Sequence, residues 1–166
     1  MRPRASAESA RSPERELLIF EIGASRFGLP SADVREVLRA VTIVPLPGAP
    51  PVVEGLINVR GRIVPVMDIR RRFHLAPKGL EVSDRLIVAS AGPRVVAIRA
   101  DRSGDLARVD ARDLADVRAV VPGTEYVAGV AKLSDGLVLI HDLRTFLSES
   151  EGAQLDQALR GPSGDR

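Results

Sequence analysis

Few side chains in this sequence could take part in acid–base or metal chemistry. The two histidines are His74 and His141, and neither stands in an H-x-x-x-H or H-x-E spacing. A metal site needs several ligands at suitable spacing, and the chain has no cysteine to supply thiolates. Carboxylate pairs such as Glu14 with Glu16 lie in polar stretches that are typical of a solvated surface. Because G-x-S-x-G, Walker A and G-x-G-x-x-G patterns are also missing, we predict no enzyme, no catalytic residue, no metal and no cofactor.

Two basic clusters remain as candidate binding chemistry. Residues 60–62 read Arg-Gly-Arg, and residues 70–72 are three consecutive arginines. Guanidinium groups bind phosphates and carboxylates, so either cluster could contact a nucleic acid or an acidic protein surface. The net charge is only +2, and the aromatic ring nearest to the first cluster, Phe73, lies well beyond it. A small nucleic-acid-binding β-barrel is therefore the weaker alternative, and solvated arginines at a helix end are the ordinary interpretation of the second cluster.

The elements that must position these clusters read mostly as β-strands. Apolar runs separated by Gly, Pro, Ser and Asp predict hairpins within residues 17–30, 55–68, 85–100 and 126–140. The Arg-Gly-Arg stretch falls at the tip of the second of these hairpins. Asp68 then stands where it can cap a short helix. Residues 31–38 predict a helical turn that begins at Ser31 and carries its apolar side chains on one side.

The sequence repeats itself at an offset of 74 residues. The matched pairs include Gly55 with Gly129, Val64 with Val138, Asp68 with Asp142 and Arg70 with Arg144. A repeat this long is not a solenoid unit, and it predicts two small β-barrels or sheets of similar plan. The hairpin tips differ, because residues 58–62 carry the Arg-Gly-Arg stretch whereas residues 132–136 read as an ordinary turn.

We predict one folded unit over residues 16–150, made of two intertwined β-subdomains that divide near residues 75–85. Residues 1–15 are polar and contain two prolines, which favours a disordered arm. Residues 151–166 are rich in glycine and predict a frayed helix and a C-terminal tail, in which Leu155 could still pack. No apolar run approaches the ~20 residues of a membrane span and no secretion signal is visible, so we expect a cytoplasmic protein.

Residues 53–70, which follow the Pro-Leu-Pro of residues 45–47, resemble the CheW-like domain of bacterial chemosensory systems. The family pattern is a proline loop, G-[VI]-[IT]-N-L-R-G, an apolar strand with proline, and then D-L-R. Here the glycine is Gly55, the strand proline is Pro65 and the aspartate is Asp68, with valine and isoleucine in place of the two leucines. Several motifs occur in the family's order, which makes the resemblance specific.

The resemblance covers residues 17–148 and implies both a fold and a function. The fold would be all-β, with two SH3-like five-stranded β-barrel subdomains and short helices. The function would be that of a non-catalytic scaffold adapter, which couples methyl-accepting chemoreceptors to a CheA-type histidine kinase in cytoplasmic chemosensory arrays. The signalling tip of the receptor would dock in the groove between the two subdomains.

The resemblance also implies a set of receptor-binding positions. Carried over motif by motif, they are Val34, Glu36, Gly55, Asn58, Arg60 and Gly61. The ordinary interpretations are core packing for the valine and backbone geometry for the two glycines. A receptor tip is a helical hairpin, so Arg60 could donate to a carboxylate or to the last carbonyls of a helix. We expect Glu36 to pair with Arg60 in the free protein and to orient it.

Residues 98–105 depart from the apolar-V-D-x-V pattern that the family carries there, although we still expect a strand. The kinase-binding residues are therefore not predicted, and binding of a receptor is better supported than recruitment of a kinase. The alternative within the same fold is a divergent CheW-like module that binds receptors, or other CheW-like domains, without recruiting kinase.

Overall fold

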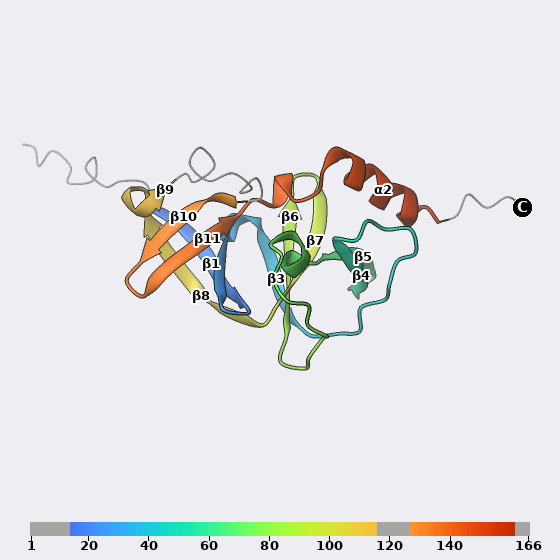
Figure 1. Ribbon diagram of the computed structural model, residues 1–166, viewed down its shortest axis with the longest axis horizontal. Coiled ribbons are helices and arrows are strands. Elements are labelled where there is room, and N and C mark those ends of the chain that lie inside the picture. Colours follow the sequence, from blue (N-terminus) through green and yellow to red (C-terminus); the bar gives the residue numbers. More distant parts are fainter. Residues whose placement is uncertain (1–13, 116–126, 162–166) are drawn as a thin grey trace, which may run out of the picture.

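The computed structural model describes residues 14–115 and 127–161, which form two β-sheets and a C-terminal helix (Figure 1). The first sheet contains β1 (Glu14–Ile22), β2 (Ser25–Pro30), β8 (Arg102–Asp110), β9 (Leu114–Ala115), β10 (Val127–Leu133) and β11 (Gly136–His141). The second contains β3 (Val34–Arg39), β4 (Val53–Val59), β5 (Arg62–Met67), β6 (Arg85–Ala91) and β7 (Arg94–Ala100). The helices are α1 (Ile69–Arg72) and α2 (Glu149–Leu159), with single 3₁₀ turns at η2 (Ser31–Asp33), η3 (Ala111–Asp113) and η4 (Leu143–Thr145). The predicted all-β class with two small subdomains is confirmed, and one sheet gains a sixth, two-residue strand.

Each sheet combines hairpins from both sequence repeats. The strand orders are β8-β1-β2-β11-β10-β9 and β3-β6-β7-β5-β4. In the first sheet the early β1–β2 hairpin lies beside the late β10–β11 hairpin, through parallel pairing of β2 with β11. In the second, the β4–β5 hairpin lies beside β6–β7, through parallel pairing of β5 with β7. The repeats have therefore exchanged hairpins, which intertwines the two subdomains.

The division between the subdomains differs from the predicted one. The chain enters the second sheet at Val34 and leaves it at Ala100. We predicted the split at residues 75–85. These residues connect α1 to β6, and the strands before and after this connection, β5 and β6, belong to the same sheet. The sequence repeat suggested one subdomain per repeat, but the exchange of hairpins moves the boundaries to the ends of β2 and β7.

A shared core holds the two sheets together. Phe20 and Phe27 from the first sheet pack in one buried cluster with Ile87 and Ile98 from the second, and Leu155 from α2 joins them. Each sheet also encloses a smaller apolar cluster of its own. Because the largest cluster takes residues from both sheets, burial of apolar area fixes how they sit against each other.

The segment 31–38 is mostly strand, and the predicted helical turn is confined to η2. In β3 the burial alternates, with Val34, Glu36 and Leu38 half-buried and the residues between them exposed. That is the two-residue period of a strand, whereas the prediction rested on the apolar side chains alone. The polar Glu36 on the inner face hid the alternation.

The two ends of the described chain are more regular than we predicted. Strand β1 begins at Glu14, within the stretch that we predicted as a disordered arm, while residues 1–13 lie outside the described residues. Helix α2 begins with a capping box between Ser148 and Glu151, and its Leu155 is fully buried. None of the described helices is both long enough and apolar enough to cross a membrane.

Candidate functional site

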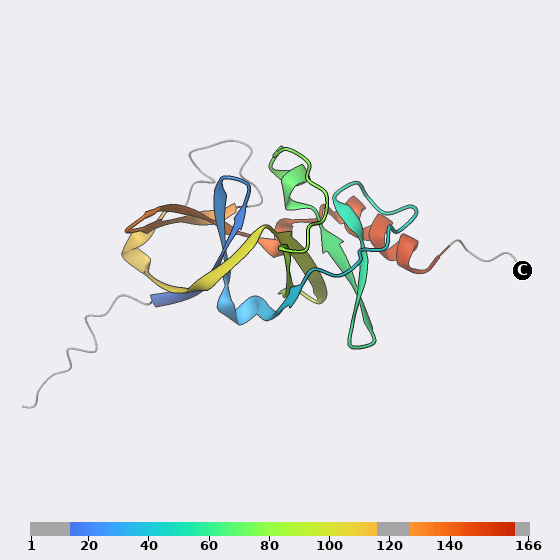
Figure 2. The same cartoon turned by 90° about the horizontal axis from the view of Figure 1, so that it is seen from below.

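The tip of the β4–β5 hairpin is a tight turn of two left-handed residues. Val59 pairs with Arg62, which leaves Arg60 and Gly61 as the connection. Their φ angles are +52° and +84°, as a type I′ hairpin turn requires. Glycine adopts such angles freely, but arginine does so at a cost of about 1–2 kcal/mol. The hairpin projects from the body of the protein (Figure 2).

Asn58 stabilises this turn from within the hairpin. Its side-chain oxygen Oδ1 accepts a hydrogen bond of 2.8 Å from the backbone N–H of Gly61. Asn58 itself is exposed, so the amide serves the turn and not the core. The tip therefore presents Arg60 from a backbone that is held in one conformation.

An ion pair joins the hairpin tip to the opposite edge of the same sheet. Arg60 Nη1 lies 3.1 Å from Glu36 Oε2, and the two side chains are 83% and 23% exposed. β3 and β4 are the two outer strands of the second sheet, so the sheet must curl for this contact to form. The predicted pairing of Glu36 with Arg60 is thus present, and it spans the mouth of the small barrel.

The other two predicted residues support the fold at this place. Val34 is half-buried and packs against the core shared by the two sheets. Gly55 lies under the proline loop (residues 40–52): a Cβ there would come within 2.3 Å of the carbonyl oxygen of Val44. No side chain fits in that space, so the glycine is required by backbone contact.

All six predicted residues lie on the second subdomain. Glu36, Asn58, Arg60 and Gly61 come together at the barrel mouth, whereas Val34 and Gly55 lie deeper. The four best-defined surface hollows of the described residues are lined by none of the six. The part of the set that comes together therefore lies around the Glu36–Arg60 ion pair.

Buried charges at the junction of the two sheets were missed by the sequence reasoning. Asp101 connects β7 to β8 and accepts from Arg70 at 2.6 Å, from the Gly23 N–H at 2.7 Å and from Lys78 at 3.2 Å. Burial opposes ionisation of this carboxyl, but these hydrogen bonds outweigh it and lower its pKa to about 2. Asp101 therefore stays charged and ties the β1–β2 turn to the second sheet.

A second carboxylate extends this network. Asp84 is fully buried and accepts from Lys78 at 2.5 Å and from Arg99 at 3.4 Å. Arg99 also forms a two-pronged pair with Glu54, with its Nε 3.0 Å from Oε2. Arg99 and Asp101, which lie in the stretch 98–105 that departs from the family pattern, thus form ion pairs within the protein. The only sequence signal for them was an unusual charge in a strand.

The arginine cluster at residues 70–72 is largely internal, which corrects our interpretation of solvated arginines. Arg70 and Arg72 point into the protein, and only Arg71 is exposed. Arg72 donates to the backbone oxygen of Phe146 at 2.6 Å and forms an ion pair with Glu151 at the start of α2. A short helix thus uses alternate arginines to hold the subdomain junction and the C-terminal helix.

His141 is a buried histidine at the end of β11. It is 2% exposed and lies among the rings of Phe27, Phe73 and Phe146, with ring centroids 5.1–6.4 Å away. Neither ring nitrogen has a hydrogen-bond partner among the described residues. Burial, with a contribution from the nearby Arg72 charge, lowers its pKa to about 3. Within the described residues no group of His, Asp and Glu is arranged to hold a metal ion.

Comparison with known proteins extends over most of the chain. The family model of the CheW-like domain matches residues 16–151. The chemotaxis protein CheW of Treponema pallidum is 27% identical over 142 residues, covering 82% of this chain and 84% of that protein. Protein FrzA of Myxococcus xanthus is 37% identical over 111 residues, covering 67% and 69%.

A solved structure shares the fold. It is the crystal structure of the scaffolding protein TtCheW from Thermoanaerobacter tengcongensis, with a TM-score of 0.77 and 26% identity. The match covers 84% of this chain and 96% of TtCheW. With the family model matching so much of the chain, the protein belongs to the CheW-like domain family.

Proposed function

We propose that this protein is a non-catalytic chemotaxis adapter, which joins the signalling tip of a chemoreceptor to a CheA-type histidine kinase in cytoplasmic arrays. Membership of the CheW-like family supports the adapter role. The observation that carries the receptor-binding part is the barrel mouth, where an exposed arginine stands on a fixed turn and is oriented by Glu36.

The barrel mouth suits an acidic or carbonyl-rich partner surface. Arg60 uses one guanidinium nitrogen for Glu36, and its exposed side chain leaves further N–H donors for a partner. A guanidinium fork can bind a carboxylate or the last carbonyls of a helix, both of which a helical receptor tip offers. The fixed turn lowers the entropy lost when the contact forms.

The receptor-binding part is tested by replacing Arg60 with alanine. We expect the affinity for a receptor signalling tip to fall about tenfold, as for an arginine near the centre of an interface. The matched control is Arg62→Ala, which removes an exposed arginine two residues away that has no ion pair among the described residues. Calorimetry with the purified tip measures both, and equal affinities for the two variants would reject this role of Arg60.

Kinase recruitment is tested separately, by reconstitution of the receptor tip, the kinase and this protein. We expect kinase activity to rise when the protein is added and to fall back when Arg60→Ala replaces it. A protein that binds the tip but leaves the kinase unstimulated would instead be a module that binds receptors or other CheW-like domains. That second candidate is favoured by residues 98–105, because Arg99 and Asp101 in this stretch are used internally.

Nucleic-acid binding has little support from the geometry. Arg70 and Arg72, which belong to the strongest basic cluster, each form an internal ion pair. Phosphate contacts need cations on the surface, and each one makes the affinity more dependent on salt. A steep salt dependence of binding to DNA or RNA would favour this third candidate.

A further inference from the structure

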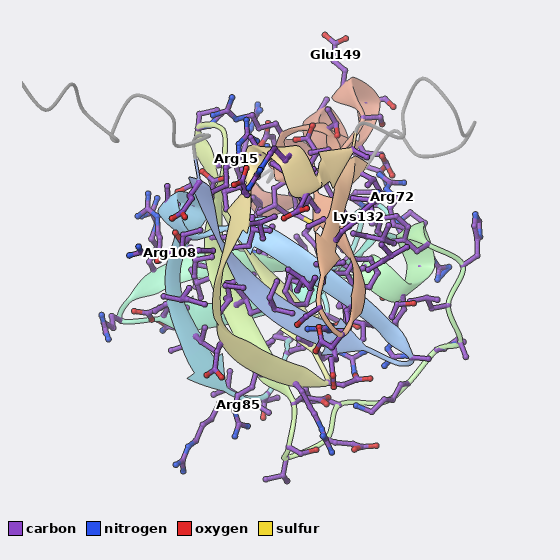
Figure 3. The ribbon with its side chains drawn as sticks, turned by 90° about the vertical axis from the view of Figure 1, so that its left-hand side faces the viewer. Arg15, Arg72, Arg85, Arg108, Lys132 and Glu149 are labelled. Atoms are coloured by element: carbon purple, nitrogen blue, oxygen red, sulfur yellow. The ribbon has the colours of Figure 1, made fainter. Side chains whose placement is uncertain are left out.

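Helix α2 is held firmly to the second subdomain. Leu155 is fully buried in the shared core. On either side of it, Glu151 forms an ion pair with Arg72 of α1, and Asp156 lies 2.7 Å from Arg94 of β7. Figure 3 shows Glu149, at the first position of the helix, pointing away from the body. The family match ends at residue 151, so most of α2 lies beyond the matched region.

One face of α2 reaches the proline loop. Gln154 Nε2 donates a hydrogen bond of 3.1 Å to the carbonyl oxygen of Gly48. A Cβ on Gly48 would lie 3.9 Å from the Cβ of Ala158, one turn further along the helix. Gln157 lines the same hollow between loop and helix, but it has no hydrogen bond to the loop. Gln154 is therefore the polar link from α2 to this loop.

The proline loop in turn holds the strand that leads to the hairpin tip. The Val44 N–H donates to the Leu56 oxygen at 2.9 Å, and the Leu56 N–H donates to the Val44 oxygen at 2.7 Å. The same carbonyl of Val44 is the group that leaves no room for a Cβ at Gly55. Leu56 lies two residues before Asn58, which fixes the turn. Gly48 is thus connected to the tip through the loop backbone, the paired hydrogen bonds of Val44 with Leu56, and strand β4.

The far end of α2 also borders the hairpin itself. Leu159 lines a hollow of about 330 Å³ together with Arg62, Ile63 and Pro65 of β5. Both views place α2 beside the β4–β5 hairpin (Figures 1 and 2). The helix therefore lies beside the hairpin across this hollow, and its hydrogen bond to the neighbouring segments goes to the proline loop.

We propose that α2 is a positioning element of the receptor-binding surface, in which Gln154 holds the proline loop and thereby the β4–β5 hairpin that carries Arg60. The effect on receptor binding rests on the proposed function, whereas the effect on the hairpin does not. Gln154 contacts no partner in this arrangement and acts through the loop.

The test compares Gln154→Glu with Gln157→Glu. Both variants replace an amide by a carboxylate on the same helix, so their charge is equal, but only the first removes the donor to Gly48. We expect amide hydrogen exchange at Val44, Leu56 and Gly61 to be about fivefold faster in Gln154→Glu, as the loss of one hydrogen bond of ~1 kcal/mol implies. Exchange at Ile87, in the middle of the second sheet, should be unchanged in both variants.

The outcomes separate the two proposals. Equal exchange in the two variants would overturn the positioning role, because the hydrogen bond from Gln154 to Gly48 would then have no specific effect. Faster exchange at Ile87 as well would also overturn it, because that result indicates general destabilisation. Faster exchange confined to the loop and the hairpin supports it, and the affinity for the receptor tip should then fall about three- to fivefold in Gln154→Glu. If Arg60→Ala leaves that affinity unchanged while the exchange result holds, the proposed receptor site fails and the positioning of the hairpin stands.

Discussion

The β4–β5 and β10–β11 hairpins share a backbone plan and differ at their tips. Each has the same irregularity in its strand pairing, between Val53 and Gly55 in one and between Val127 and Gly129 in the other. In each, the glycine faces a backbone carbonyl of an antiparallel segment that pairs with the strand. A Cβ added to Gly55 would lie 2.3 Å from the Val44 oxygen, and one added to Gly129 would lie 2.9 Å from the Ala115 oxygen. The repeat thus preserves those positions where a backbone contact leaves no choice of side chain.

The two hairpin tips carry charges of opposite sign, and each forms an ion pair with a residue on a strand. In the first hairpin a cation at the tip, Arg60, pairs with an anion on the opposite edge strand of the sheet, Glu36. In the second an anion at the tip, Asp135, pairs with the strand cation Arg26 at 2.9 Å. Among the described non-glycine residues only Arg60 and His74 have positive φ. Strained residues of this kind concentrate at functional sites, which supports the proposal that the first tip belongs to the receptor-binding surface.

Replacing the shared glycines by alanine should produce the largest effect and separate the repeats. Gly55→Ala drives a Cβ into the Val44 carbonyl, and we expect it to lower the free energy of unfolding by about 3 kcal/mol or more. Gly129→Ala meets the Ala115 carbonyl at a longer distance and should cost about 1–2 kcal/mol. Urea denaturation measures both, with Gly79→Ala, which has open space around it, as the control. Equal losses at the two sites would show that the repeats are under the same backbone constraint.

The last residues of β5 and β11 offer the second test, because they are Met67 and His141 at matched positions. His141 is buried without charge, and its pKa falls from 6.5 to about 3 on folding. Between these values the unfolded chain binds more protons, so stability is lost as the pH falls through this range. At pH 5 the loss is about 2 kcal/mol relative to pH 8.

Exchanging the histidine for the residue of the other repeat should remove this pH dependence. We expect the stability advantage of His141→Met over the unaltered protein to grow by about 2 kcal/mol between pH 8 and pH 5. The control is His74→Gln, which replaces the exposed histidine and should retain the pH dependence that His141 causes. Parallel profiles for His141→Met and the unaltered protein would mean that His141 is protonated as easily in the folded as in the unfolded chain.

Local patterns were enough to predict most of the strands and the hairpin tip, because their signals lie within a few residues. The turn at Arg60 and Gly61 and the cap at Asp68 are of this kind. Strand β3 was missed since its inward Glu36 faces a partner 24 residues away, which no local period reveals. Strand β8 has little apolar character of its own, and it forms along the open edge of β1.

The burial of charged residues was equally beyond local reasoning. Three consecutive arginines look alike in sequence, but whether each is solvated depends on Asp101 and Glu151, which the fold brings to residues 70–72 from far along the chain. Helix α2 is different, since the capping box from Ser148 to Glu151 was a local signal and could have been read. The exchange of hairpins between repeats could not be predicted, because either pairing satisfies the same apolar pattern.

The smallest effect that we expect on stability comes from Arg60→Asn. This substitution tests directly why the first tip has an arginine in a strained backbone conformation. Asn-Gly is the favoured sequence of a type I′ turn, because asparagine tolerates a left-handed backbone better than arginine does. Arg60→Asn also removes the ion pair with Glu36. Because the arginine side chain is 83% exposed, this ion pair contributes little to stability. Arg60→Asn should therefore raise the free energy of unfolding by up to about 1 kcal/mol while it weakens receptor binding as Arg60→Ala does. Urea denaturation and tip-binding calorimetry on the same preparation measure the two effects. A variant that loses stability would mean that the ion pair outweighs the backbone strain, and that the arginine is kept at this turn for the fold.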